Sequence, residues 1–296
     1  MALPMTAPRQ ILPGRTYLVT RRCLLRHFFL RPSKVVNQVL AYVLALAAER
    51  YGVQVHAYCV LSNHLHLVLT DPHARLPAFQ QFLAAFVARA LNAHLGRWEY
   101  FWAPCTYSAV VLGSPEDVIS KAAYTLANPV AAGLIHAGRL WPGLWSAPDT
   151  IGTTIRVKRP DHFFDRDGLL PEYVDLELKV PAGFSSTEDF RDQLRAELAR
   201  QEQAARDAIP TFLGVARVQA QSPFARPRPD EPRRRLSPRV AARDKWRRIE
   251  LLQQLKTFLT DYWEALRVWR EGKVDPVFPH GTYLMRVAHG VACAPA

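Results

Sequence analysis

The chain has 296 residues, a hydrophobic content of 49%, a net charge of +12 and a pI near 9.9. This composition excludes a disordered chain and predicts a folded protein with more than one domain. It has no run of 18 apolar residues and no secretory signal pattern, so we expect no membrane span and a cytoplasmic location. Its four cysteines form no Cys-x2-Cys pair, which predicts free thiols.

The first half of the chain alternates between strand-like and helix-like segments. Val, Leu and Tyr dominate the strand-like stretches, and the helical ones carry apolar residues at helical spacing. In chain order we predict a strand over 16–23, a helix over 33–51, strands over 55–61 and 64–70, a helix over 77–95, a strand over 107–112 and a helix over 115–128. This mixture predicts an α+β sandwich.

Two histidines lie one residue apart on the predicted strand over 64–70. Successive side chains of a strand point to opposite faces, so His64 and His66 share one face and Leu65 and Leu67 share the other. Neutral imidazole is the commonest metal ligand, and two of them on a rigid strand can hold one ion. The alternative is a pair of half-exposed histidines with structural hydrogen bonds, and the spacing alone names no reaction.

Tyr124 and Asn128 lie four residues apart on the predicted helix that begins after Ser114. Residues at this spacing share a helix face, and Pro129 is expected to end or kink the helix just beyond them. A phenol is a weak nucleophile until a nearby cation polarises the phosphate it attacks, and the Asn128 amide oxygen is a possible third ligand for that cation. The alternatives are a packing tyrosine and an asparagine that caps a turn.

Several motifs in this order resemble the single-tyrosine HUH transposases, most of all the REP-associated tyrosine transposases. The resemblance covers about residues 10 to 150. It rests on the strand Asn63-His64-Leu65-His66 and on the helix with Tyr124, Asn128-Pro129-Val130 and Gly133-Leu134, together with Arg89-Ala90-Leu91-Asn92, Gly96-Arg97, Phe101-Trp102 and the opening strand from Tyr17 to Arg22. Asn128, one turn beyond Tyr124, favours the single-tyrosine arrangement over the two-tyrosine one.

The resemblance implies a ferredoxin-like antiparallel sheet with helices on one side and a metal on its open face. It implies that His64, His66 and Asn128 hold Mg2+ or Mn2+. Tyr124 would attack a phosphate of single-stranded DNA, leaving a 5′-phosphotyrosine and a free 3′-hydroxyl for strand transfer. The implied DNA is a hairpin or a repetitive palindrome, and relatives act as monomers or homodimers. Residues 101–110 depart from the family pattern and leave Tyr107 as an outside candidate for a second phenol.

Two other functions stay open at this point. One is a domesticated DNA-hairpin-binding protein that has lost cleavage. The other is a metallohydrolase with water as nucleophile, which needs further ligands such as His56, His73 or His94.

The second half of the chain lies outside the resemblance. We predict a nuclease domain over 1–150, an accessory region with a Pro/Arg-rich connector over 151–238, and a long basic amphipathic helix with a tail over 239–296. Within these, strands are expected over 153–158 and 173–180, a helix over 187–208 capped by Ser186 or Thr187, an extended connector over 210–238, a helix over 239–272 and a final strand over 281–287. Trp141 and Trp145 are expected to close an edge of the first domain.

Positive charge is concentrated between Arg226 and Arg248. This segment has ten Lys and Arg residues and three Asp and Glu residues, which gives it a net charge of +7. Such a surface predicts single-stranded or hairpin DNA as partner, because lysine and arginine displace the counterions of phosphates. The candidate DNA-binding residues are Arg21, Arg22, Arg89, Arg97, Arg233, Arg234, Arg235, Lys245, Arg247 and Arg248.

Overall fold

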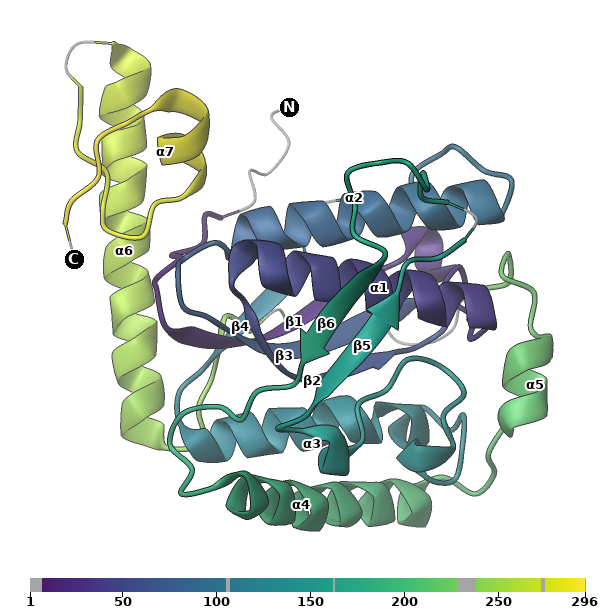
Figure 1. Cartoon of the computed structure of the whole chain (residues 1–296). Coiled ribbons are helices and arrows are strands. Elements are labelled where there is room, and N and C mark those ends of the chain that lie inside the picture. Colours follow the sequence, from purple (N-terminus) through teal and green to yellow (C-terminus); the bar gives the residue numbers. More distant parts are fainter. Residues whose placement is uncertain (1–6, 105–106, 162, 228–237, 273–274, 296) are drawn as a thin grey trace.

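A five-stranded sheet organises the chain in this computed structural model, which describes residues 7–104, 107–161, 163–227, 238–272 and 275–295 (Figure 1). The strands lie in the order β2-β3-β1-β4-β7. Their bounds are Arg15–Arg22 for β1, Gln54–Val60 for β2, His64–Asp71 for β3, Ser108–Leu112 for β4 and Val240–Ala241 for β7. The first four strands pair antiparallel, which confirms the predicted α+β fold, and β7 joins β4 in parallel.

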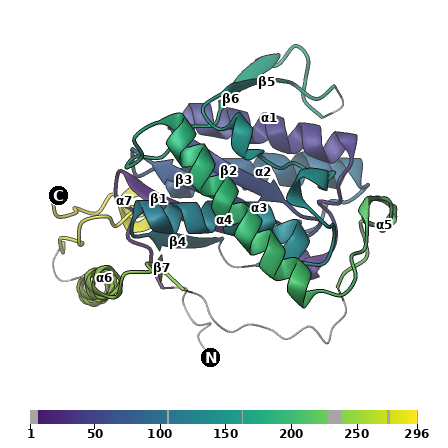
Figure 2. The same ribbon diagram turned by 90° about the horizontal axis from the view of Figure 1, so that it is seen from below.

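Helices α1 (Lys34–Tyr51) and α2 (Leu76–His94) cover one face of the sheet (Figure 1). The Ser33 hydroxyl caps α1 by accepting from the Val36 amide, and Gly52 ends it with a φ of 67°. Helix α3 (Pro115–Ala131) crosses the opposite face, where it contacts β2 and β3 (Figures 1 and 2). The face expected to be open therefore carries the tyrosine helix.

Pro129 does not end α3 at Asn128 as predicted, because the helix continues to Ala131. A proline removes one backbone donor and crowds the preceding turn, and both effects are tolerable within the last turn of a helix. The Ala132 amide donates to the Asn128 carbonyl at 2.9 Å, which completes that turn. Asn128 thus lies on regular helix, and its side chain projects from the same face as that of Tyr124.

The accessory region adds a second layer on each side of the sheet. Strands β5 (Thr154–Lys158) and β6 (Tyr173–Glu177) form a hairpin over α1, and α4 (Thr187–Ala208), capped by Ser186, packs along α3 (Figure 2). The hairpin and α4 bury Val157, Leu176, Phe190 and Leu194 in the same hydrophobic core as the sheet. The core therefore continues past residue 150 without a break.

The two tryptophans after α3 close an edge of the fold, as predicted. The Trp141 indole N–H donates to the Val60 carbonyl at 2.8 Å, and that of Trp145 donates to the Leu126 carbonyl at 3.0 Å. These bonds satisfy carbonyls at the end of β2 and in α3, so the indoles are structural groups.

The last part of the chain differs from the prediction in three places. A short helix, α5 (Val215–Ala220), interrupts the expected connector. Helix α6 (Lys245–Glu271) starts six residues late, because β7 joins the sheet and Asp244 caps the helix. The predicted strand over 281–287 is wrong: Leu284–His289 forms helix α7, which packs Met285 against Phe258 and Tyr262 of α6. No helix within the described ranges is long and apolar enough to cross a bilayer.

Asp117 ties the start of α3 to the segment that leads into α6. Its buried carboxylate accepts from the Arg243 amide at 2.8 Å and from the Ser114 hydroxyl at 3.0 Å. We predict that Asp117→Ala lowers the free energy of unfolding by about 1–3 kcal/mol, because it leaves the partly buried Arg243 amide and Ser114 hydroxyl without their acceptor. Glu116→Ala, the exposed neighbour in the same turn, should change it by less than about 0.5 kcal/mol. Urea unfolding of both variants measures this, and equal losses would refute the role of Asp117.

Candidate active site

Strand β3 places both histidines on the face that α3 covers. The ring centroids of His64 and His66 lie 4.8 Å apart with an interplanar angle of 79°. His66 is buried at 4% exposure, and His64 is half-buried. Leu65 and Leu67 point into the core on the other face. The alternation of a half-buried strand therefore brings the two imidazoles together.

Hydrogen bonds set the tautomer of each imidazole. The Asn128 side-chain Nδ2 donates to His66 Nε2 at 3.1 Å, so the proton of that neutral ring is on Nδ1. His66 Nδ1 lies 2.9 Å from the Thr20 hydroxyl of β1, which accepts it. His64 Nδ1 donates to the Asn63 side-chain oxygen at 2.6 Å. Both rings therefore keep Nε2 as the nitrogen with a lone pair.

Burial holds both histidines in the neutral form. It lowers the pKa of His66 to about 3, with a further contribution from Arg22. It also lowers the pKa of His64 well below its usual value, and the charges of Arg22 and Arg26 add to this. Neutral imidazole is the form that binds metal ions, so both side chains are ready to act as ligands near pH 7.

Helix α3 presents Tyr124 and Asn128 to these imidazoles. The Tyr124 ring stands edge-on to His66, with centroids 5.6 Å apart and an interplanar angle of 87°. The tyrosine is 41% exposed, while Asn128 is buried at 8%. The Lys121 ammonium lies 5.6 Å from the centre of the tyrosine ring. The arrangement thus joins an accessible phenol to two neutral imidazoles, a carboxamide and a nearby cation.

Three residues of this site were not identified from the sequence. Lys121 lies one turn before Tyr124, and the spacing of three on a helix is a readable signal. Thr20 contacts His66 only because β1 pairs with β3 in the register Thr20↔His66, which no local pattern specifies. Arg26 lines a pocket together with His64 and belongs to a short 3-10 turn, Leu24–Arg26, that was not predicted.

The other candidate ligands and the second phenol lie elsewhere. His56 is fully buried, with Nδ1 donating to the Lys179 carbonyl at 2.7 Å and Nε2 bonded to the Thr70 hydroxyl at 2.8 Å. Tyr107 is buried beneath the Arg9 guanidinium and lines a groove with α2, and burial raises its pKa to about 12. Within the described ranges no three His, Cys, Asp or Glu side chains gather as metal ligands.

The predicted DNA-binding arginines of the first domain have different surroundings. Arg22 is exposed and lines a pocket beside His64. Arg21 lies over the Trp102 ring, and exposed Arg89 lies over Phe86. Arg97 stacks on Phe29 and pairs with Glu99 at 3.2 Å, so it is held within the protein. Only Arg22 of this group is placed at the candidate active site.

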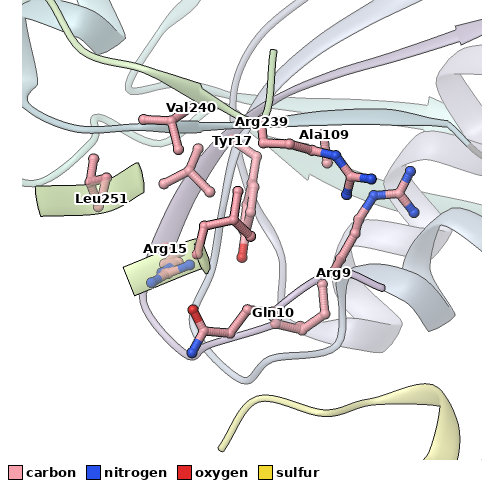
Figure 3. A pocket seen from close by; sticks show the side chains of 11 residues that line it. Arg9, Gln10, Arg15, Tyr17, Ala109, Arg239, Val240 and Leu251 are labelled. Atoms are coloured by element: carbon pink, nitrogen blue, oxygen red, sulfur yellow. The ribbon is translucent and has the colours of Figure 1, made fainter. Parts of the chain in front are cut away.

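The basic start of α6 is not at this site. Lys245, Arg247 and Arg248 lie where α6 meets the Arg15 end of β1, and the charge of Arg247 adds to the burial that lowers the pKa of Arg15. Figure 3 shows the small pocket at this seam, about 30 Å³ in volume, with Arg9, Arg15 and Arg239 around it. His64 pairs with Arg22 at the other end of the strand, about 23 Å away at a rise of about 3.3 Å per residue. Arg233, Arg234 and Arg235 lie outside the described residues.

Comparisons with known proteins found similarity only among solved structures, since no family model and no curated protein matches the chain. A REP-associated tyrosine transposase bound to a REP hairpin is similar over 47% of this chain and 80% of its own, with 18% identity and a TM-score of 0.40. A putative transposase from Deinococcus radiodurans R1 is similar over 36% of this chain and 85% of its own, with 23% identity and a TM-score of 0.29. At such TM-scores neither likeness bears on the chemistry of the site.

The neutral state of His66 makes stability depend on pH. Its pKa falls from the ordinary 6.5 to about 3 on folding, so the unfolded chain binds the proton more tightly. The stabilisation is complete above about pH 6.5 and is lost as the pH falls toward 3. Between pH 7 and pH 5 we expect a loss of about 2 kcal/mol from this residue.

Denaturant unfolding of wild type and His66→Gln at both pH values measures this loss. The variant should lose about 2 kcal/mol less than wild type between pH 7 and pH 5. His73→Gln, at an exposed loop position, should behave like wild type. An equal loss in His66→Gln and wild type would show that this imidazole is not held neutral.

Proposed function

We propose that the chain nicks single-stranded DNA and transfers the strand through a covalent phosphotyrosine at Tyr124, with Mg2+ or Mn2+ bound by His64, His66 and Asn128. One observation carries the proposal: an exposed phenol stands edge-on to a buried neutral imidazole whose Nε2 contacts Asn128. A purely structural tyrosine gains nothing from exposure at such a position, whereas a nucleophile needs it.

The donor set fits a divalent cation. Each imidazole is anchored through Nδ1, to Thr20 or to Asn63, which is the usual arrangement for a histidine that binds a metal through Nε2. A half-turn of the Asn128 carboxamide exchanges its nitrogen for its oxygen, so Oδ1 can face the same place. When bound, the cation supplies charge neutralisation and orientation of the phosphate.

The protein side chains then account for the transfer. The Tyr124 oxygen forms a bond to phosphorus while the bond to the 3′-oxygen breaks. The phenol gives up its proton, and the departing oxygen takes one up to become a 3′-hydroxyl. Lys121 and Arg22 place positive charge near the phosphate. The phosphotyrosine keeps the energy of the original bond, so a second 3′-hydroxyl can reverse the step and join a new strand.

Two features bear on the alternatives that remain. A protein that only binds DNA hairpins does not need an accessible phenol packed against two neutral imidazoles, which favours retained cleavage. Tyr124 also lies beside His66 of its own chain, with ring centroids 5.6 Å apart, which supports a site formed within one chain. We extend the proposal to hairpin or repetitive palindromic DNA on the family resemblance of the motifs.

Removal of the phenol oxygen tests the nucleophile. With Mg2+ or Mn2+, wild type should form a covalent adduct with a labelled single-stranded oligonucleotide, seen as a shifted band on a denaturing gel. Tyr124→Phe should form none, because the attacking atom is gone. Tyr107→Phe is the matched control and should react like wild type. Adduct formation by Tyr124→Phe would exclude Tyr124 as the nucleophile.

Substitution of Thr20 tests whether His66 binds the metal and leaves the proposed ligands themselves unchanged. Thr20→Val removes the acceptor for Nδ1–H, and loss of such a partner lowers metal affinity by about 10- to 100-fold. Thr16→Val, four residues earlier on β1, loses only a bond to Thr70 and should bind as wild type. Titration of Mn2+ followed by electron paramagnetic resonance measures both. Unchanged affinity in Thr20→Val would argue against His66 as a ligand.

A further inference from the structure

A second pocket adjoins the candidate active site. It has a volume of about 250 Å³ and shares His64 with that site. Its walls come from four places: the loop after β1, the turn between β2 and β3, the end of α3 and the segment after α5. This volume is just below the range of about 300–1,000 Å³ typical of drug-sized ligands, which suits a single nucleotide base.

The wall after α5 is fixed by hydrogen bonds to the first domain. The Arg31 guanidinium donates to the backbone carbonyls of Gln219 and Gln221 at 2.9 and 3.1 Å. The Phe28 amide donates to the Ala225 carbonyl at 2.9 Å. Gln221, a lining residue, is therefore held in place rather than carried on a loose connector.

The loop after β1 brings positive charge to this pocket, and two of its residues have an unfavourable backbone conformation. Leu25 and Arg26 have φ values of 50° and 62°, a left-handed conformation that is unfavourable for residues with a side chain. The Leu24 amide, bonded to the Phe101 carbonyl at 2.9 Å, helps to hold this turn. Arg22 and Arg26 both line the pocket.

The unpaired hydroxyl of Ser62 is a second, independent observation that indicates a ligand. It lines the pocket at 5% exposure, and its buried hydroxyl has no hydrogen-bond partner among the described residues. A buried polar group without a partner is costly, so such groups in native proteins call for an explanation. A bound polar molecule in the pocket would provide that partner.

We propose that this pocket receives the base of the nucleotide next to the cleaved phosphate, with Arg22 and Arg26 at the DNA backbone and Gln221 at the base edge. The inference rests on the proposed function and deepens it. Phe28 offers a ring for stacking, and the Gln221 carboxamide offers a donor and an acceptor for one base edge. Only an unpaired base can enter, so the pocket also selects single-stranded DNA.

Sequence preference at the cleavage site tests this proposal. The full-length protein is incubated with Mn2+ and a pool of single-stranded oligonucleotides of random sequence, and the covalent adducts are isolated and sequenced. Wild type should show a base preference at a position next to the joint. Gln221→Ala should reduce that preference about fivefold or more, while the preferences at other positions stay as in wild type.

Gln219→Ala is the matched control, because this glutamine is exposed two residues away and does not line the pocket. It should keep the wild-type preference. If adducts form and Gln221→Ala keeps the same preference, the base pocket is wrong and the proposed cleavage stands. If wild type forms no adduct, the proposed cleavage fails.

Photocrosslinking tests the pocket without cleavage. Single-stranded DNA that carries 5-iododeoxyuridine should crosslink to Phe28, as identified by mass spectrometry of the digested protein. Phe28→Leu should lose this product, whereas Phe224→Leu, at an exposed position outside the pocket, should retain it. Absence of a Phe28 crosslink in wild type would overturn the inference, whatever the outcome of the cleavage assay.

Discussion

The contact between Asn128 and His66 joins the tyrosine helix to the central sheet, and the rest of the candidate site depends on it. It lies where α3 crosses the sheet face opposite α1 and α2, on which α3 packs through buried residues such as Val118, Ala122 and Leu126. It also fixes the His66 tautomer, because an amide nitrogen can only donate. Tyr124, one turn earlier on the helix, then stands beside the same imidazole. A strand, a helix and a single polar contact between them thus assemble the whole group.

Local periodicity was enough to predict the two halves of this site. The two-residue period of a strand placed His64 and His66 on one face, and the helical period paired Tyr124 with Asn128. The elements of the first half lie within about three residues of their predicted ends. The partners across the sheet were beyond such reasoning, because the register that places Thr20 beside His66 depends on the pairing of whole strands.

The second half was harder to predict because tertiary contacts override short local patterns there. Val240–Ala241 has only two residues and forms a strand because β4 offers a free edge. The segment 281–287 was predicted as a strand. Most of it instead belongs to helix α7, which packs on α6 and places Met285 in a small core. The segment after α5 reads as a connector by composition but is bonded to Phe28 and Arg31, beside His64. The accessory region therefore forms part of the wall of the pocket that includes His64.

Diffraction from crystals soaked in Mn2+ tests the central claim most directly, because anomalous scattering locates the ion itself. We expect one strong anomalous peak about 2.0–2.3 Å from the Nε2 atoms of His64 and His66 and the Oδ1 atom of Asn128, with the Tyr124 hydroxyl nearby. A peak at other side chains, or full manganese loading with none at these three atoms, would contradict it.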